Sequence, residues 1–152
     1  MISLLEHADG LIAEQIHCVF QRSYQIEAEL VGVKAFPPLA RTIDDIKNSN
    51  SLFFGFYEAE ELAGVIEVEY KNSRLDIHSL TVEPNFFRRG IAGKLIEYVL
   101  RKFDWQKAVV ETAAVNKPAI TLYEKYGFVT HKQWTPEHGI EKVAMSQCRG
   151  FE

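Results

Sequence analysis

The chain has little cysteine, no long apolar run and no excess of positive charge, and each absence excludes a class of protein. Its 152 residues include only two cysteines, Cys18 and Cys148, too few for the disulfide framework of a small secreted protein. No segment approaches the run of about eighteen apolar residues that spans a membrane, and no basic leader precedes an apolar stretch at the N-terminus. The formal net charge of −4 argues against a general nucleic-acid surface. We therefore expect a cytoplasmic protein with no membrane and no nucleic-acid partner.

Length and composition predict one domain that spans residues 1–152. A hydrophobic content of 47% and a charged content of 25% are those of an ordinary globular protein. A chain of this size buries about 70% of the surface that it exposes when unfolded, which is enough for a substantial core. No internal repeat or low-complexity segment divides the sequence.

The most informative stretch runs from Leu80 to Leu95 and reads LTVEPNFFRRGIAGKL. It passes from β-branched apolar residues through a basic, glycine-containing turn into a helical pattern. Arg88 and Arg89 supply positive charge, and Gly90 and Gly93 remove side chains where backbone N–H groups would approach an anion. The first turn of the following helix adds unpartnered N–H donors and roughly half a positive charge. The stretch therefore predicts a site for a pyrophosphate group.

Two well-known phosphate-binding loops do not fit the turn, although the residues after it have the spacing of a helix. The P-loop needs serine or threonine after its lysine, whereas Leu95 follows Lys94, and residues 90–95 do not supply the Gly-x-Gly-x-x-Gly of a dinucleotide fingerprint. The apolar positions that share one face of the predicted helix are Ile91, Leu95, Ile96, Val99, Leu100 and Phe103.

The same stretch resembles motif A of the Gcn5-related N-acetyltransferase (GNAT) superfamily, Arg/Gln-x-x-Gly-x-Gly/Ala. Residues 87–92 align with it, and Phe87 stands where the family usually has arginine or glutamine. The resemblance implies that the turn binds the pyrophosphate of acetyl-CoA, mostly through backbone donors. It also implies that the preceding strand splays open and pairs its backbone with the pantetheine arm. The cofactor-binding residues implied by this motif are Leu80, Thr81, Val82, Phe87, Arg88, Arg89, Gly90, Ile91, Ala92 and Gly93.

A second motif of the same superfamily lies further along the chain. Residues 116–128, NKPAITLYEKYGF, are similar to motif B, Asn-x-x-Ala-x-x-Leu-Tyr-x-x-x-Gly-Phe. Asn116 can cap a helix that carries Pro118 in its first turn, and Gly127 can end that helix in a left-handed conformation. The resemblance adds Asn116, Ala119 and Tyr123 to the cofactor-binding residues.

The order of the predicted elements agrees with this family. The resemblance implies an α/β fold of the GNAT type, with a central mixed, mostly antiparallel sheet flanked by helices. Helices are expected after Asp9, from Thr42 to Ile46, after Gly90 and after Asn116, and an ordered loop is expected over Gly32–Leu39. Strands are expected at Ile2–Leu5, Leu52–Tyr57, Leu62–Tyr70, Leu75–Val82, Ala108–Ala113, Phe128–Trp134 and Lys142–Met145.

Acetyl transfer to an amine needs a group that removes the proton of the amine. Asp76 and His78 stand two residues apart in a predicted strand, so they share one face of it. In the alignment with the superfamily, Asp76 falls where histone-type members have a glutamate base, and His78 falls where arylalkylamine-type members have a histidine. A structural role is the alternative for each of them. Further candidates on neighbouring strands are Glu67, Glu69 and Glu111.

The departing CoA thiolate needs an acid, and Tyr123 is our candidate. It holds the motif B position that family members commonly use for this purpose. A phenol with an ordinary pKa near 10 stays protonated at neutral pH. Simple packing of the ring on a buried helix face is the alternative. Neither Cys18 nor Cys148 lies in a motif of an acyl carrier, so we expect direct transfer, without a metal.

The sequence does not identify the acceptor substrate, which we expect to be a primary amine of a small molecule or of a peptide. A catalytically weak acyl-CoA sensor would keep the same pyrophosphate site. An unrelated nucleotide-binding module would explain the pyrophosphate site but not the second motif. The superfamily often forms homodimers, which adds a second copy of the chain as a potential partner. Aromatic residues that could line an acceptor pocket are Phe20, Tyr24, Phe36, Phe54, Phe56 and Trp134.

Overall fold

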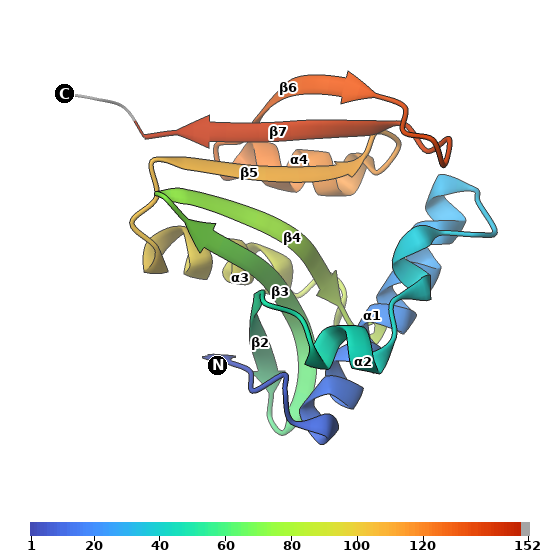
Figure 1. Ribbon diagram of the computed structural model, residues 1–152, viewed down its shortest axis with the longest axis vertical. Coiled ribbons are helices and arrows are strands. Elements are labelled where there is room, and N and C mark those ends of the chain that lie inside the picture. The colour runs from blue at the N-terminus through green and yellow to red at the C-terminus, as the bar shows by residue number, and fades with distance from the viewer. Residues whose placement is uncertain (150–152) are drawn as a thin grey trace.

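The computed structural model of the chain describes residues 1–149 and contains one seven-stranded sheet with strand order β1-β2-β3-β4-β5-β7-β6. Helices α1 and α2 lie on one face of the sheet and α3 and α4 on the other (Figure 1). No helix in this described part is long and apolar enough to cross a membrane. The elements are β1 (Ile2–Leu4), α1 (Gly10–Val31), η1 (Pro37–Ala40), α2 (Ile43–Lys47), β2 (Leu52–Glu58), β3 (Glu61–Lys71), β4 (Arg74–Val82), η2 (Pro84–Phe86), α3 (Ile91–Lys102), β5 (Lys107–Ala113), α4 (Lys117–Lys125), β6 (Val129–Trp134) and β7 (Lys142–Cys148).

Neighbouring strands are antiparallel except for β4 and β5. The β3–β4 hairpin turns at Asn72 and Ser73, whose positive φ angles of 53° and 62° suit a two-residue turn. The parallel pair β4–β5 is joined by a crossover that contains α3, as a parallel connection requires. The predicted fold class, a mixed and mostly antiparallel sheet flanked by helices, is therefore confirmed.

The predicted capping interactions at the helix ends are confirmed. The Asp9 side chain accepts a hydrogen bond from Leu11 N at 2.8 Å, and α1 ends at Gly32 with φ of 82°. Thr42 and Asp45 form a capping box at the start of α2. The expected loop over residues 32–39 is partly wrong, because Pro37–Ala40 forms a 3-10 helix. Two consecutive prolines fit its first turn, where the missing N–H groups need no partner.

Side chains point alternately to the two faces of the sheet along each strand, so a separate hydrophobic core forms on each face. Phe53 and Val65 pack with α1 and α2, whereas the next residues, Phe54 and Ile66, pack with α3. A third, smaller cluster joins the end of α1 to the end of β5 and the loop before β7. Its buried members are Ala28, Phe36, Ala113 and Ile140.

Strand β4 carries a bulge that changes its alternation. Glu67 of β3 pairs with Ser79, but the next residue, Val68, pairs with Ile77, so His78 is an extra residue in β4. As a result, Ile77 and Leu80 both contribute to the α3 side of the core, although they are three residues apart. The bulge keeps apolar side chains on the core face on both sides of the irregularity.

The parallel pairing of β4 and β5 stops midway along both strands. It runs from Arg74 opposite Lys107 to Ile77 opposite Val110, and no pairs follow in the described structure. Beyond this point β4 stays paired with β3, and β5 stays paired with β7. The two halves of the sheet therefore diverge, as the separation of β4 and β5 in Figure 1 shows.

A partly buried ion pair ties the segment after α1 to the sheet. The Arg41 guanidinium donates two hydrogen bonds to the carboxylate of Glu67, at 2.6 and 2.9 Å. Ser79 of the bulge donates a third, at 3.0 Å. Burial alone would raise the pKa of Glu67, but the hydrogen bonds and charge of Arg41 outweigh it and lower this pKa. The pair thus joins the loop, β3 and the β4 bulge.

We expect Glu67→Gln to lower the free energy of unfolding by about 2 kcal/mol at pH 7, because Arg41 would lose its counter-charge in a largely buried place. A carboxyl whose pKa is lowered by folding stabilises the protein above its ordinary pKa and loses this effect as pH falls. The difference between the variant and the wild type should therefore shrink below about pH 4. Urea unfolding at several pH values measures it.

Glu69→Gln is the matched control, because Glu69 lies on the same strand with its side chain 54% exposed, against 4% for Glu67. We expect this control to change the free energy of unfolding by less than about 0.5 kcal/mol. Equal effects of the two substitutions would contradict a special role for the Arg41–Glu67 pair.

Candidate active site

The N-terminus of α3 is open to an anion. Gly90 precedes the helix with φ of 75°, no side chain caps the first turn, and this turn contains no acidic residue. The first N–H groups of α3 therefore have no side-chain partner. Arg88 and Arg89 are exposed beside them, and neither forms an ion pair with another residue between 1 and 149. A side chain added at Gly90 would meet nothing within 4 Å. These features fit a pyrophosphate group.

Gly93 has a packing role in addition to the predicted approach of the backbone to an anion. A Cβ atom at this position would lie 2.6 Å from the hydroxyl of Tyr126. Gly93 is buried, and it gives room for α3 to pack against the end of α4. Phe87, in contrast, is exposed just before the turn.

The separated part of β4 presents its backbone to the split in the sheet. Leu80 and Val82 turn their side chains toward the core beneath α3. Thr81 is buried on the opposite side, where its hydroxyl lies 3.5 Å from the carbonyl of Val65. The edge of β4 that would pair with β5 is left without a strand partner from residue 78 onward. Such an edge can bind an extended ligand through main-chain hydrogen bonds.

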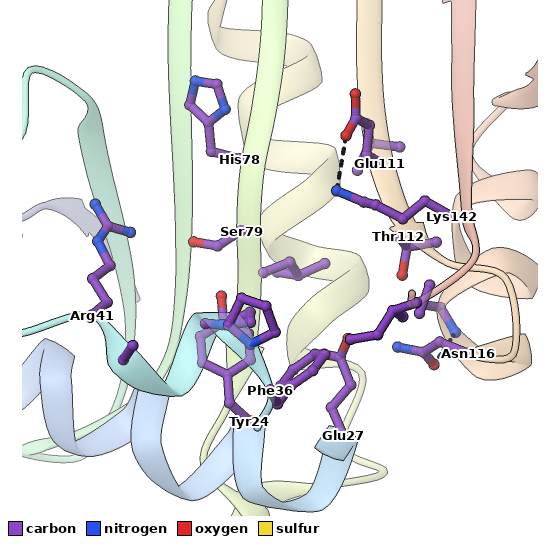
Figure 2. A pocket seen from close by; sticks show the side chains of 18 of the residues that line it. Tyr24, Glu27, Phe36, Arg41, His78, Ser79, Glu111, Thr112, Asn116 and Lys142 are labelled. Carbon is purple, nitrogen blue, oxygen red and sulfur yellow. Dashed lines mark hydrogen bonds and ion pairs between the residues drawn. The ribbon is translucent and has the colours of Figure 1, made fainter. Parts of the chain in front are cut away.

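A cavity of about 900 Å³ lies at this split. Its walls come from α1 and the loop after it, from β4 and β5, and from the start of α4 and the loop before β7 (Figure 2). Of the aromatic residues proposed for an acceptor pocket, Tyr24 and Phe36 line this cavity. Phe20, Phe54 and Phe56 instead belong to the two main cores.

Tyr123 reaches the cavity from α4 and is otherwise buried, with 5% of its surface exposed. Its ring packs edge to face on Phe128, with ring centres 5.7 Å apart. Burial raises the pKa of its phenol, and the nearby Tyr24 and Glu27 raise it further. The phenol therefore holds its proton at neutral pH, as an acid catalyst must.

Asn116 and Ala119 also line the cavity, at the start of α4. The Asn116 side-chain oxygen accepts a hydrogen bond from Ala119 N at 3.3 Å, which confirms the predicted cap. The cap uses the oxygen and leaves the amide nitrogen for another partner. Burial raises the pKa of Glu27, and the side chain of Asn116 opposes this rise.

The structure separates the two polar residues predicted on β4. His78 lies at the rim of the cavity, and its Nε2 atom is 3.0 Å from the carboxylate of Glu69. Asp76 lies in the part of β4 that is still paired with β5, opposite Val109. It accepts a hydrogen bond from Arg74 at 3.0 Å and does not line the cavity. The geometry therefore brings His78 to the site but not Asp76.

The other predicted carboxylates are already engaged. Glu67 is held by Arg41 and has a lowered pKa, so it is a weak proton acceptor. Glu111 lines the cavity but accepts a hydrogen bond from Lys142 at 2.9 Å, which Figure 2 shows as a dashed line.

Glu27 also belongs to the site, although no sequence motif pointed to it. This residue lies on α1, three positions after Tyr24, so the two side chains share a helix face. Both line the cavity, and Figure 2 shows them reaching from α1 toward the split strands. The only available signal was an acidic residue on the same face as an aromatic one. Such a pattern is common on solvated helices.

Comparisons with known proteins identify relatives of this chain in sequence and in fold. A family model for the acetyltransferase (GNAT) domain matches residues 25–147. The UPF0157 protein YqkA of Bacillus subtilis (strain 168) is 36% identical over 129 residues, which are 84% of this chain. The chain spans only 38% of the length of that relative.

Two solved structures illustrate the likeness in fold. The ribosomal-protein-S18-alanine N-acetyltransferase from Escherichia coli superposes with a TM-score of 0.77 at 19% identity, over 100% of this chain and 95% of the other. The PaiA N-acetyltransferase from Thermoplasma acidophilum, solved in complex with coenzyme A, gives a TM-score of 0.74 at 16% identity, over 98% and 99% of the two chains. At such identities the likeness concerns the fold.

The packing of Gly93 against Tyr126 predicts that the effect of Gly93→Ala on the free energy of unfolding depends on the Tyr126 hydroxyl group. We expect Gly93→Ala to lower the free energy of unfolding by about 1 to 2 kcal/mol, because the new methyl group overlaps the Tyr126 oxygen. In a Tyr126→Phe background the same substitution should be neutral or slightly stabilising, since alanine is the better helix former. Thermal unfolding of the four proteins of this cycle measures the coupling.

Gly90→Ala is the control for this cycle. Its cost of about 1 kcal/mol comes from the left-handed backbone, and it should be the same with Tyr126 or Phe at position 126. A loss from Gly93→Ala that is equally large in both backgrounds would contradict the packing explanation.

Proposed function

The chain belongs to the GNAT acetyltransferase family, and we propose that it transfers an acetyl group from acetyl-CoA directly to a primary amine of a small molecule or peptide. The observation that carries this proposal is the separation of β4 from β5 after Ile77 and Val110. The separated part of β4 leads directly into the turn before α3, and it shares one cavity with Tyr123. A pyrophosphate site, an extended backbone edge and a buried acid are thus contiguous.

Acetyl-CoA, when bound, supplies the acetyl group as an activated thioester. In this proposal the first N–H groups of α3, together with Arg88 and Arg89, hold the pyrophosphate. The backbone of residues 80–82 pairs with the pantetheine amides in the way that another strand would. Asn116 contributes its side-chain amide at the opposite wall.

Tyr123 is the proposed acid for the leaving thiolate. The conjugate acid of a thiolate has an ordinary pKa near 8.5, so the sulfur takes up a proton readily at neutral pH. Tyr123 holds its proton because burial raises its pKa. Its place in the cavity, with a ring fixed on Phe128, keeps the hydroxyl in one orientation.

The acceptor amine has to lose a proton before it can attack. An alkylamine with a pKa near 10.4 is uncharged at pH 7 in only about one molecule in 2,500, which corresponds to roughly 4.6 kcal/mol. We propose that His78 passes this proton to solvent, because it stands at the cavity rim and Glu69 orients its ring. Asp76 has no part in this proposal.

We also propose that the protein acts in the cytoplasm. Cys18 and Cys148 are both exposed and form no disulfide. Exposed thiols of this kind suit a reducing compartment.

The test is the release of CoA thiol from acetyl-CoA with a panel of small amines and N-terminal peptides, for the wild type and Tyr123→Phe. We expect turnover with one class of acceptor and at least a tenfold lower kcat in the variant, because phenylalanine keeps the ring but cannot donate a proton. The affinity for acetyl-CoA should stay the same.

Tyr126→Phe is the matched control, because it removes a hydroxyl from the same helix end without touching the cavity. We expect it to retain activity. Full activity of Tyr123→Phe would contradict the acid role. Tight acetyl-CoA binding without turnover on any acceptor would favour an acyl-CoA sensor instead.

A further inference from the structure

Glu27 differs from the other acidic residues around the cavity in its partners. Glu111 is held by Lys142, and Asp45 accepts from the backbone N–H of Thr42 at 2.9 Å. Glu67, which lines a neighbouring hollow, is held by Arg41. Glu27 forms no ion pair with any residue of the described range 1–149. It is therefore the carboxylate of the cavity that can accept a positively charged ligand.

The groups around Glu27 come from every wall of the cavity. Tyr24 stands one turn earlier on α1, Tyr123 faces it from α4, and Lys142 faces it from β7. Glu111 draws the Lys142 ammonium toward β5. The other titratable groups in the wall are Arg41 and His138, on the loops after α1 and before β7, Asp45 on α2 and His78 on β4. Burial raises the pKa of Glu27, against the opposing effects of Asn116 and Lys142.

The environments of Glu27 and Tyr123 suit opposite catalytic roles. The negative charge of Glu27 helps to raise the pKa of the Tyr123 phenol, so the phenol keeps its proton. The carboxyl, with a pKa raised toward neutrality, becomes a stronger base than an exposed glutamate. A phenol and a carboxyl that line one cavity supply the two groups of an acid and base pair.

We infer that Glu27 binds the ammonium group of the acceptor and removes its proton. This inference rests on the proposed acetyl transfer and deepens it. One N–H bond of the ammonium breaks, an O–H bond forms on the Glu27 carboxylate, and the nitrogen keeps the electron pair that makes its new bond to the acetyl carbon. As the carbon–sulfur bond breaks, Tyr123 protonates the sulfur, and the second proton of the nitrogen restores the phenol. Glu27 then releases the one net proton, which His78 at the rim passes to solvent.

The wall beside Glu27 indicates the class of acceptor. Tyr24 and Phe36 meet edge to face, with ring centres 6.1 Å apart, and both border the cavity. Aromatic rings next to a carboxylate favour a cation that is attached to an apolar chain. The acceptor class is therefore a primary alkylamine that arrives protonated. An arylamine, which is uncharged at neutral pH, has no need of Glu27.

Glu27→Gln tests this inference, because it keeps the shape and removes the charge. At pH 7 we expect kcat/KM for the best alkylamine to fall about 100-fold. The wild-type value should fall as pH drops through the pKa of Glu27. The variant should lack this step, and its rate should rise with pH as the amine itself loses its proton, so that the two proteins approach each other above about pH 9.

A reactive arylamine serves as a second acceptor in the same assay. With it we expect Glu27→Gln to stay within about threefold of the wild type, because no proton has to be removed beforehand. Glu29→Gln is the matched control, an exposed glutamate on the same helix, and should stay within twofold for both acceptors. The unfolding temperature of Glu27→Gln should equal or exceed that of the wild type, since a carboxyl with a raised pKa destabilises the folded state when ionised.

The outcomes separate this inference from the proposed function. A wild type that acetylates no amine at all would overturn the proposed function and the inference with it. An active wild type with an unchanged rate and pH profile in Glu27→Gln would overturn only the role of Glu27. Equal losses with the alkylamine and the arylamine would also overturn it, because a merely structural role would affect both acceptors alike.

Discussion

The end of the pairing between β4 and β5 is the constraint on which the rest of this structure depends. The backbone groups on the other edge of each strand stay hydrogen-bonded, those of β4 to β3 and those of β5 to β7. Both strands therefore remain in the sheet where it opens. The bulge at His78 stands at the point of separation and restores the alternation of side chains beyond it. The opened edges need hydrogen-bond partners, and a ligand with amide groups along an extended chain can supply them.

The residues around the opening show that the neighbours of a carboxylate determine whether it stabilises the fold or is available to a ligand. Glu67 is more deeply buried than Glu27, yet Arg41 and Ser79 lower its pKa and make it part of the framework. Glu27 has only the amide of Asn116 and the distant charge of Lys142, so burial dominates and its pKa rises. Burial acts to raise the pKa of both glutamates, but only Glu67 has a counter-ion that outweighs this effect, so the two pKa values shift in opposite directions.

Much of the fold followed from local patterns. The caps at Asp9, Thr42 and Asn116 and the strand boundaries depend on residues within a few positions of one another, and the structure agrees with them. Gly93 shows what such reasoning misses. Local patterns identified this glycine as special, but they did not predict its contact with the hydroxyl of Tyr126 at the end of another helix. A sequence pattern cannot distinguish room for a ligand from room for a neighbouring side chain.

The sequence by itself determined the order of the elements, the basic glycine turn with Arg88 and Arg89, and the helix that carries Tyr123, because short-range periodicity and capping encode all three. Only the tertiary structure decided which polar groups meet. It left Asp76 in the paired part of β4 and brought Glu27 from α1 to the same cavity as Tyr123. The physical reason is that burial and the choice of charged neighbours arise from packing between segments far apart in the chain, and these two quantities set the pKa of each group.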